Sequence, residues 1–112
     1  MKRYNKLLAG ASWMAEYGNP DVPEDWEFIQ TWSPYHLVEK DAEYPKVFFW
    51  TTTRDDRVHR GHARKMVARM EEMGHPVLYF ENIEGGHGAG STNRQRAEIT
   101  AMEYSYLWMQ LQ

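Results

Sequence analysis

The chain of 112 residues contains no cysteine, which excludes both a disulfide framework and a thiolate metal site. It also contains no run of the roughly 20 apolar residues that a membrane-spanning helix needs. The N-terminal stretch MKRYNKLLAGASWM is too short and too polar for a secretory signal peptide. We therefore expect a soluble protein of the cytoplasm or the periplasm, with no membrane partner.

An excess of one charge is missing as well. The 16 acidic and 13 basic residues are interspersed and give a formal net charge of −3. No basic face is left for a phosphate backbone, so nucleic acid is not an expected partner. The hydrophobic fraction of 42% and the aromatic fraction of 14% are instead typical of a globular domain. A chain of this size buries only about 65% of its unfolded surface, so a single modest core is available.

The first half of the chain has little regular pattern. Residues 1–45 are rich in aromatic residues, proline and glycine, and they predict one short helix over about 23–31, begun by Pro23 and the acidic pair that follows it. The rest of this half is expected to form loops. Trp13 and Tyr17 are spaced by four residues, and such a pair belongs to a core at least as often as to a binding pocket.

From Tyr44 onward the pattern becomes regular. KVFFWTTT predicts a strand covered on both faces, and PVLYFENI predicts a second strand. Between them, apolar residues at helical spacing predict a methionine-rich helix over 62–73, with Gly74 as its C-cap glycine. A final helix is expected over about 92–110, and most of its apolar stripe is expected from Ala97, Ala101, Tyr104, Leu107, Trp108 and Leu111.

This order of strand, helix, strand and helix predicts an α/β fold with parallel strands and a right-handed crossover. Two strands make a poor sheet, because a parallel sheet needs cover on both faces. We therefore expect the chain to be a piece of a larger α/β domain, or to pair with another copy of itself.

Polar residues gather where each predicted strand ends. RDDRVHRGH follows the first strand, and EGGHGAG follows the second. In open α/β sheets, ligands and chemistry lie outside the carboxyl ends of the strands. Asp55 and His87 could therefore meet, with the carboxylate accepting the Nδ1 proton of the imidazole and leaving Nε2 as a general base. Their order along the chain is that of the Asp and His of an α/β-hydrolase triad.

Other roles for these residues stay open on the pattern alone. Asp55 could be a solvated loop residue or a helix cap, Asp56 is its immediate competitor, and His87 could be an exposed turn residue. His59 and His62 lie three residues apart with two aspartates nearby, but no full ligand set at metal spacing is present. We expect neither a metal nor a cofactor.

Four stretches of the sequence together carry a resemblance. GASWMAEYGNP, WSPYHLV, DDRV and GGHGAG, in this order, resemble the C-terminal part of the catalytic domain in the prolyl oligopeptidase family of serine peptidases. The resemblance covers nearly the whole chain and implies the C-terminal portion of an α/β-hydrolase fold. It implies that Asp55 and His87 are the Asp and His of a Ser-His-Asp triad that cleaves peptides after proline.

The same resemblance implies a substrate pocket. Arg57 would bind a substrate carbonyl near the scissile bond, and Val58 would line the pocket for the proline ring. Trp13 would stack on the proline, with Tyr17 beside it. A flat indole suits a pyrrolidine ring, and a multi-donor guanidinium suits carbonyl recognition. On this interpretation, residues 1–45 form the pocket segment and residues 46–112 form the β-α-β-α unit with the Asp and His.

Family features that lie upstream of this segment are not found in the sequence. No serine stands in a G-x-S-x-G elbow, since GASWM around Ser12 lacks the second glycine, and Met1 resembles an internal methionine of a longer family member. We therefore expect the nucleophile, the oxyanion hole and a β-propeller to belong to a missing N-terminal part, and the isolated chain to be inactive. The alternatives are a non-catalytic fragment that associates with itself, or a segment of another α/β-hydrolase such as an aminopeptidase or esterase.

Overall fold

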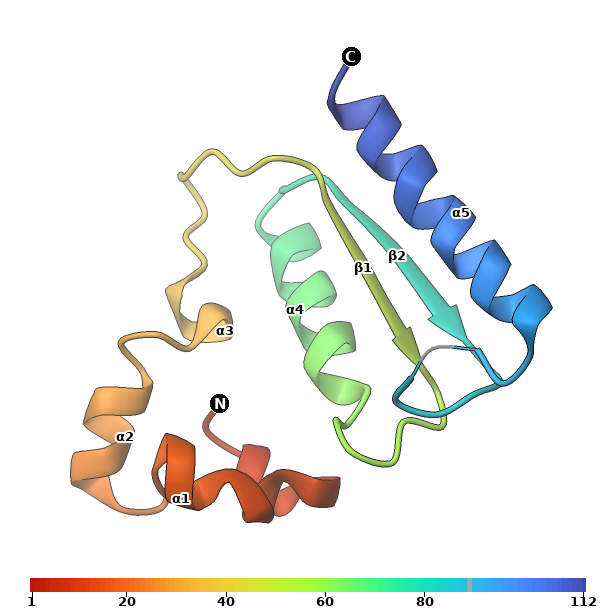
Figure 1. Cartoon of the computed structure of the whole chain (residues 1–112). Coiled ribbons are helices and arrows are strands. Elements are labelled where there is room, and N and C mark those ends of the chain that lie inside the picture. The colour runs from red at the N-terminus through yellow and green to blue at the C-terminus, as the bar shows by residue number, and fades with distance from the viewer. Residues whose placement is uncertain (89) are drawn as a thin grey trace.

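The structure is a computed structural model that describes residues 1–88 and 90–112. Its regular part consists of β1 (Val47–Thr52), α4 (Gly61–Glu72), β2 (Val77–Asn82) and α5 (Asn93–Gln110) (Figure 1). The two strands are parallel, with Val47 opposite Val77 and Thr52 opposite Asn82. The predicted α/β fold is thus confirmed, and each element is found within about one residue of its predicted bounds.

Each face of the two-stranded sheet carries one helix. Phe49 lines a cavity together with Met66 of α4, whereas the neighbouring Phe48 packs against Tyr106 of α5, with ring centroids 5.6 Å apart. This alternation is the period of two that a strand imposes on its side chains. The cover is thinner than the sequence predicts, because Tyr79 of β2 is still 38% exposed and the residues of β1 before Thr52 are only half-buried.

The end of α4 agrees with the prediction. Gly74 has a positive φ of 86°, and its amide donates to the carbonyl of Glu71. The amide of His75 donates to the carbonyl of Met70. These two hydrogen bonds form a Schellman motif, which requires the left-handed conformation that glycine adopts without strain.

The predicted apolar stripe of α5 is wrong. Ile99 is the buried residue of this helix, and Met102 and Tyr106 face the sheet beside it. Most of the expected stripe points away from the sheet: Tyr104, Leu107, Trp108 and Leu111 are exposed by 69, 46, 72 and 83%, and Ala97 is exposed too. Ala101 lines the hollow between α5 and the strands. Apolar residues lie on two sides of this helix, so its sequence alone does not decide which side meets the sheet.

The N-terminal segment is more helical than the sequence predicts. Besides α2 (Pro23–Ile29), it contains the 3₁₀ turns η1 (Tyr4–Lys6) and η2 (Leu8–Trp13) and the single-turn helices α1 (Met14–Tyr17) and α3 (Pro34–Leu37). The expectation of loops on both sides of one helix over 23–31 is therefore wrong, because such short turns carry no periodic signal.

This segment has a small core of its own and packs beside α4. Tyr4 and Ile29 are buried, and the Tyr4 hydroxyl donates to the carbonyl of Gly18 at 2.5 Å. The guanidinium of Arg69 on α4 lies 5.0 Å from the ring centroid of Tyr35 in α3. Figure 1 shows α1 near the first turn of α4, α2 further out and α3 alongside α4. Within the described residues, none of the helices combines the length and apolar character needed to cross a bilayer.

A partly exposed ion pair between Arg64 and Glu81 joins α4 to the sheet. Glu81 of β2 accepts hydrogen bonds from Arg64 at 2.5 and 2.8 Å, and also from the hydroxyls of Thr53 and Tyr79. The Arg64 guanidinium and these hydroxyls lower the pKa of Glu81 from 4.5 to about 2. Because this pKa is depressed in the folded state, the stabilisation is complete above about pH 4.5 and is lost as the pH falls towards 2.

Replacement of Glu81 tests this pair. We expect Glu81→Gln to lower the free energy of unfolding by about 1 kcal/mol at pH 7, because it removes the charge from a multiply hydrogen-bonded carboxylate. The difference from the parent should shrink as the pH is lowered from 4.5 towards 2. Urea unfolding of both proteins at pH 7 and at a pH between 4.5 and 2 measures this difference in the free energy of unfolding. Glu98→Gln is the matched control, since its pair with Arg94 is exposed on both sides and should contribute little. An equal effect of both variants at pH 7 would contradict this account.

Candidate active site

The paired strand ends bring two loops together. Thr52, the last residue of β1, is 1% exposed, and its hydroxyl donates to the carbonyl of Gly86 at 2.9 Å. This bond joins the loop after β1 to the loop after β2. Because the strands are parallel and in register, both loops leave the same edge of the sheet. The polar residues that follow each strand therefore lie side by side.

Asp55 is held by three hydrogen bonds. Its Oδ1 accepts from the backbone amides of Arg57 at 2.9 Å and Val58 at 2.8 Å, and its Oδ2 lies 2.9 Å from Nδ1 of His87. Burial by itself would raise the pKa of the Asp55 carboxyl. The hydrogen bonds from His87 and the two amides outweigh burial, and the pKa lies below its ordinary value. Asp55 is therefore a carboxylate at neutral pH.

This carboxylate fixes the tautomer of His87. An ionised Asp55 can only accept, so Nδ1 of His87 carries the proton and the lone pair of the neutral ring lies on Nε2. The His87 side chain is 41% exposed and that of Asp55 only 10%. Gly85 precedes the histidine with a φ of +95°, a conformation that glycine adopts without strain. The neighbouring Asp56 is exposed, and no hydrogen bond among the described residues joins it to His87.

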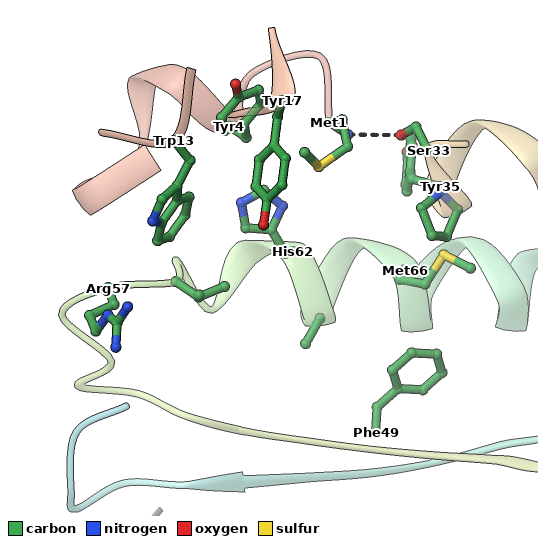
Figure 2. A pocket seen from close by; sticks show the side chains of 13 residues that line it. Met1, Tyr4, Trp13, Tyr17, Ser33, Tyr35, Phe49, Arg57, His62 and Met66 are labelled. Carbon is green, nitrogen blue, oxygen red and sulfur yellow. Dashed lines mark hydrogen bonds between the residues drawn. The ribbon is translucent and has the colours of Figure 1, made fainter. Parts of the chain in front are cut away.

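An apolar pocket of about 560 Å³ lies between the N-terminal segment and α4. Figure 2 shows the side chains of Trp13 and Tyr17 extending from the N-terminal segment into this pocket, with Arg57 at the same end as Trp13. Tyr17 is fixed by edge contacts to Tyr4 and Trp32, each with ring centroids 6.0 Å apart. The pocket is lined by all four residues expected to bind substrate, Trp13, Tyr17, Arg57 and Val58, and also by Met1, Tyr4, Ser33, Pro34, Tyr35, Phe49, His62, Ala63 and Met66.

A smaller hollow of about 300 Å³ contains the Asp55 and His87 pair. It shares Val58, His62 and Ala63 with the apolar pocket, so the two cavities adjoin along the loop after β1 and the first turn of α4. The arrangement places a base with its orienting carboxylate beside a pocket suited to an apolar ring. Such a site can remove a proton next to a bound apolar group.

Sequence reasoning missed part of this lining. His62 borders both cavities, but the sequence drew attention to it only as a metal ligand. Within residues 1–88 and 90–112, no three His, Asp or Glu side chains are arranged to hold a metal ion. The available signal was spacing, because His62 and Met66 lie four residues apart on one face of α4. Tyr4 and Phe49 carried no such signal, since they reach the pocket only through tertiary packing.

Comparison with known proteins agrees with this geometry. The family model described as the prolyl oligopeptidase family matches residues 1–112. An uncharacterised peptidase, y4nA, of Sinorhizobium fredii is 49% identical over 99% of this chain and 15% of its own length. The prolyl oligopeptidase ophP of Omphalotus olearius is 39% identical over 96% of this chain and 15% of its own length. A solved prolyl endopeptidase structure superposes with a TM-score of 0.90 at 36% identity, covering 99% of this chain and 17% of the other.

These matches and the fold define the chain as part of an α/β-hydrolase domain of a serine peptidase. The chain belongs to the prolyl oligopeptidase family. It spans about 15% of the length of the curated relatives that it matches.

Proposed function

We propose that this chain forms the proline pocket and supplies the Asp and His of a Ser-His-Asp triad in a longer endopeptidase or oligopeptidase that cleaves peptides after proline. The observation that carries the proposal is the hydrogen bond between Asp55 and Nδ1 of His87, directly beside a pocket lined by Trp13, Arg57 and Val58. The family membership supports the same reaction class.

In this proposal, His87 acts through Nε2. It takes the proton of the attacking serine and later delivers it to the leaving amine. Asp55 keeps the ring in the required tautomer and stabilises the imidazolium that forms, while the two backbone amides keep Asp55 itself in place. The reaction passes through an acyl-enzyme, which water then hydrolyses.

In this proposal, the pocket residues contact different parts of the substrate. Trp13 offers a flat indole face to the substrate proline, and Val58 lines the floor between the pocket and the His87 hollow. The exposed Arg57 has no ion-pair partner among the described residues, which leaves its guanidinium available to a substrate carbonyl. Residues 1–45 then serve as the pocket segment, and residues 46–112 carry the triad pair.

The four serines of this chain do not suit the role of nucleophile, and Ser105 lies on α5, lining a different hollow from that of Asp55 and His87. Ser33 is fully buried and bonded to His36, and Ser12 donates to the carbonyl of Ala9. Ser91 is bonded to Gln95. Among the described residues, no hydrogen bond joins a serine to His87. The nucleophile and the oxyanion hole are therefore assigned to a part of the longer protein outside this chain.

A cleavage assay on the two forms of the protein tests the proposal. We expect the 112-residue chain alone to leave a chromogenic proline peptide intact, and the longer protein that contains it to cleave the peptide after proline. Failure of the longer protein to do so, or cleavage by a sample with the mass of 112 residues, would overturn it.

We also expect the solution mass of the isolated chain to rise with concentration, because Leu107, Trp108 and Leu111 are exposed. Sedimentation of the same sample measures this.

A further inference from the structure

A third hollow, of about 390 Å³, has a lining of one charge sign. Apart from Tyr35, its ionisable side chains are the three cations Lys2, Arg3 and Lys65 and the three histidines His36, His59 and His62. None of its lining residues in the described part of the chain is an aspartate or glutamate. The chain as a whole carries a net charge of −3, so this concentration of positive groups runs against its average composition.

The cations of this hollow keep their charge available. Lys2 donates to the carbonyl of Pro20 and lies over the ring of Trp26. It forms no ion pair within the described residues, although its charge contributes to the lowered pKa of Asp21. Neither Arg3 nor Lys65 takes part in an ion pair within residues 1–88 and 90–112. Lys6, by contrast, has its carboxylate partner, Asp21, at 2.9 Å.

The histidines respond to this surplus of positive charge. Burial lowers the pKa of His62, and the charge of the Met1 amine and then those of His59 and Lys65 lower it further. Burial, the charge of the Met1 amine and then those of Arg69 and Lys2 lower the pKa of His36 in the same way. Both rings are therefore neutral at neutral pH, and each can donate or accept a hydrogen bond. An anion in this hollow would meet an attractive field.

The basic hollow is continuous with the apolar pocket. The two share Met1, Tyr35 and His62. Figure 2 shows His62 in the middle of the pocket, with Met1 and Tyr35 on the side away from Trp13. His62 also borders the hollow of Asp55 and His87, so it contacts all three cavities. A peptide with an apolar ring in the pocket can thus place a neighbouring residue in the basic hollow.

We propose that this basic hollow is a subsite for a carboxylate of the peptide substrate, carried on a residue close to the proline. The inference rests on the proposed function, since it takes the proline ring to lie in the apolar pocket. Arg3 offers a planar fork that suits a carboxylate, and Lys65 offers a compact charge. The carboxylate can come from an Asp or Glu side chain or from the free C-terminus of a short peptide.

Kinetics of the longer protein with matched peptides test this subsite. The peptides share one proline and differ at one flanking position at a time, with Asp or its neutral isostere Asn, and each is made with a free or an amidated C-terminus. At one of these positions, we expect the Asp peptide to have a kcat/KM about fivefold above that of the Asn peptide at low salt, as for a partly exposed ion pair. If the subsite binds the C-terminus instead, the free carboxylate should show the same advantage over the amide. The preference should fall as salt is added.

The variant Arg3→Gln with Lys65→Gln should bring the ratio of the two kcat/KM values close to one. Lys40→Gln, which removes a lysine outside the lining of all these cavities, should leave the ratio as it is in the parent. A ratio of one for the parent at every position, or a preference that survives in the double variant, would overturn the subsite while the neutral peptides are still cleaved. No cleavage of the neutral peptides would overturn the proposed function, and the subsite with it.

Discussion

Replacing Asp55 by asparagine in the longer protein is expected to lower kcat by roughly 10³- to 10⁴-fold, the cost of a triad without its carboxylate. The amide oxygen can still accept from the backbone amides of Arg57 and Val58, so the loop should keep its shape. The amide nitrogen, however, donates a hydrogen bond towards Nδ1 of His87. That favours the tautomer with its proton on Nε2, in which the ring cannot act as the base.

The measurement is steady-state turnover of a chromogenic proline peptide, together with thermal unfolding of the same samples. The adjacent Asp56→Asn is the matched control, because Asp56 is exposed and has no described bond to His87. It should retain kcat within a few-fold. Equal losses in both variants would point to a general electrostatic effect, and full activity of Asp55→Asn would remove Asp55 from the mechanism.

Removing the indole of Trp13 is expected to have the second largest effect. In the longer protein, Trp13→Ala should lower kcat/KM for a proline peptide roughly 30-fold, which corresponds to about 2 kcal/mol of lost apolar contact. A matched peptide with alanine before the scissile bond lacks the ring and should lose much less. The selectivity for proline over alanine should therefore fall along with the activity.

The design separates binding from folding. Trp13 lacks the aromatic contacts that Tyr17 makes with Tyr4 and Trp32, so within the described residues its removal disturbs fewer neighbours. Trp13→Phe is the matched variant, because it keeps a flat aromatic face and should retain most of the selectivity. An unchanged ratio of the two peptides in Trp13→Ala would place the proline elsewhere.

The regular half of the fold could be predicted closely because its signals are strong and local. The β-branched and aromatic runs predict β1 and β2, and the spacing of Val67 and Met70 predicts α4, ended by Gly74. The short turns of the first half could not be predicted, because a single turn holds too few residues for a period to show. The inward face of α5 could not be predicted either, since contact with the sheet, and not the helix sequence, selects Ile99 over Trp108.

The candidate site was predictable in a different way. The placement of Asp55 and His87 at neighbouring strand ends follows from parallel topology, which periodicity indicated. The pocket residues came only from the resemblance, because Trp13 and Arg57 lie far apart in sequence and meet through tertiary packing. The basic hollow had no sequence signal at all. Its residues come from three separate segments of the chain, and the interspersed charges of the sequence predict no basic face.

The pairing of Thr52 with Asn82 has a consequence for the distance between Asp55 and His87. Asp55 lies three residues beyond one partner and His87 five residues beyond the other, so the alignment of the strands fixes the starting points of both loops. A shift of one residue would displace one loop by about 3.3 Å and turn its strand over, face for face. A hydrogen bond of 2.9 Å between Asp55 and His87 could not survive that change. The alignment of the two strands thus sets the distance between the proposed base, His87, and its carboxylate, Asp55.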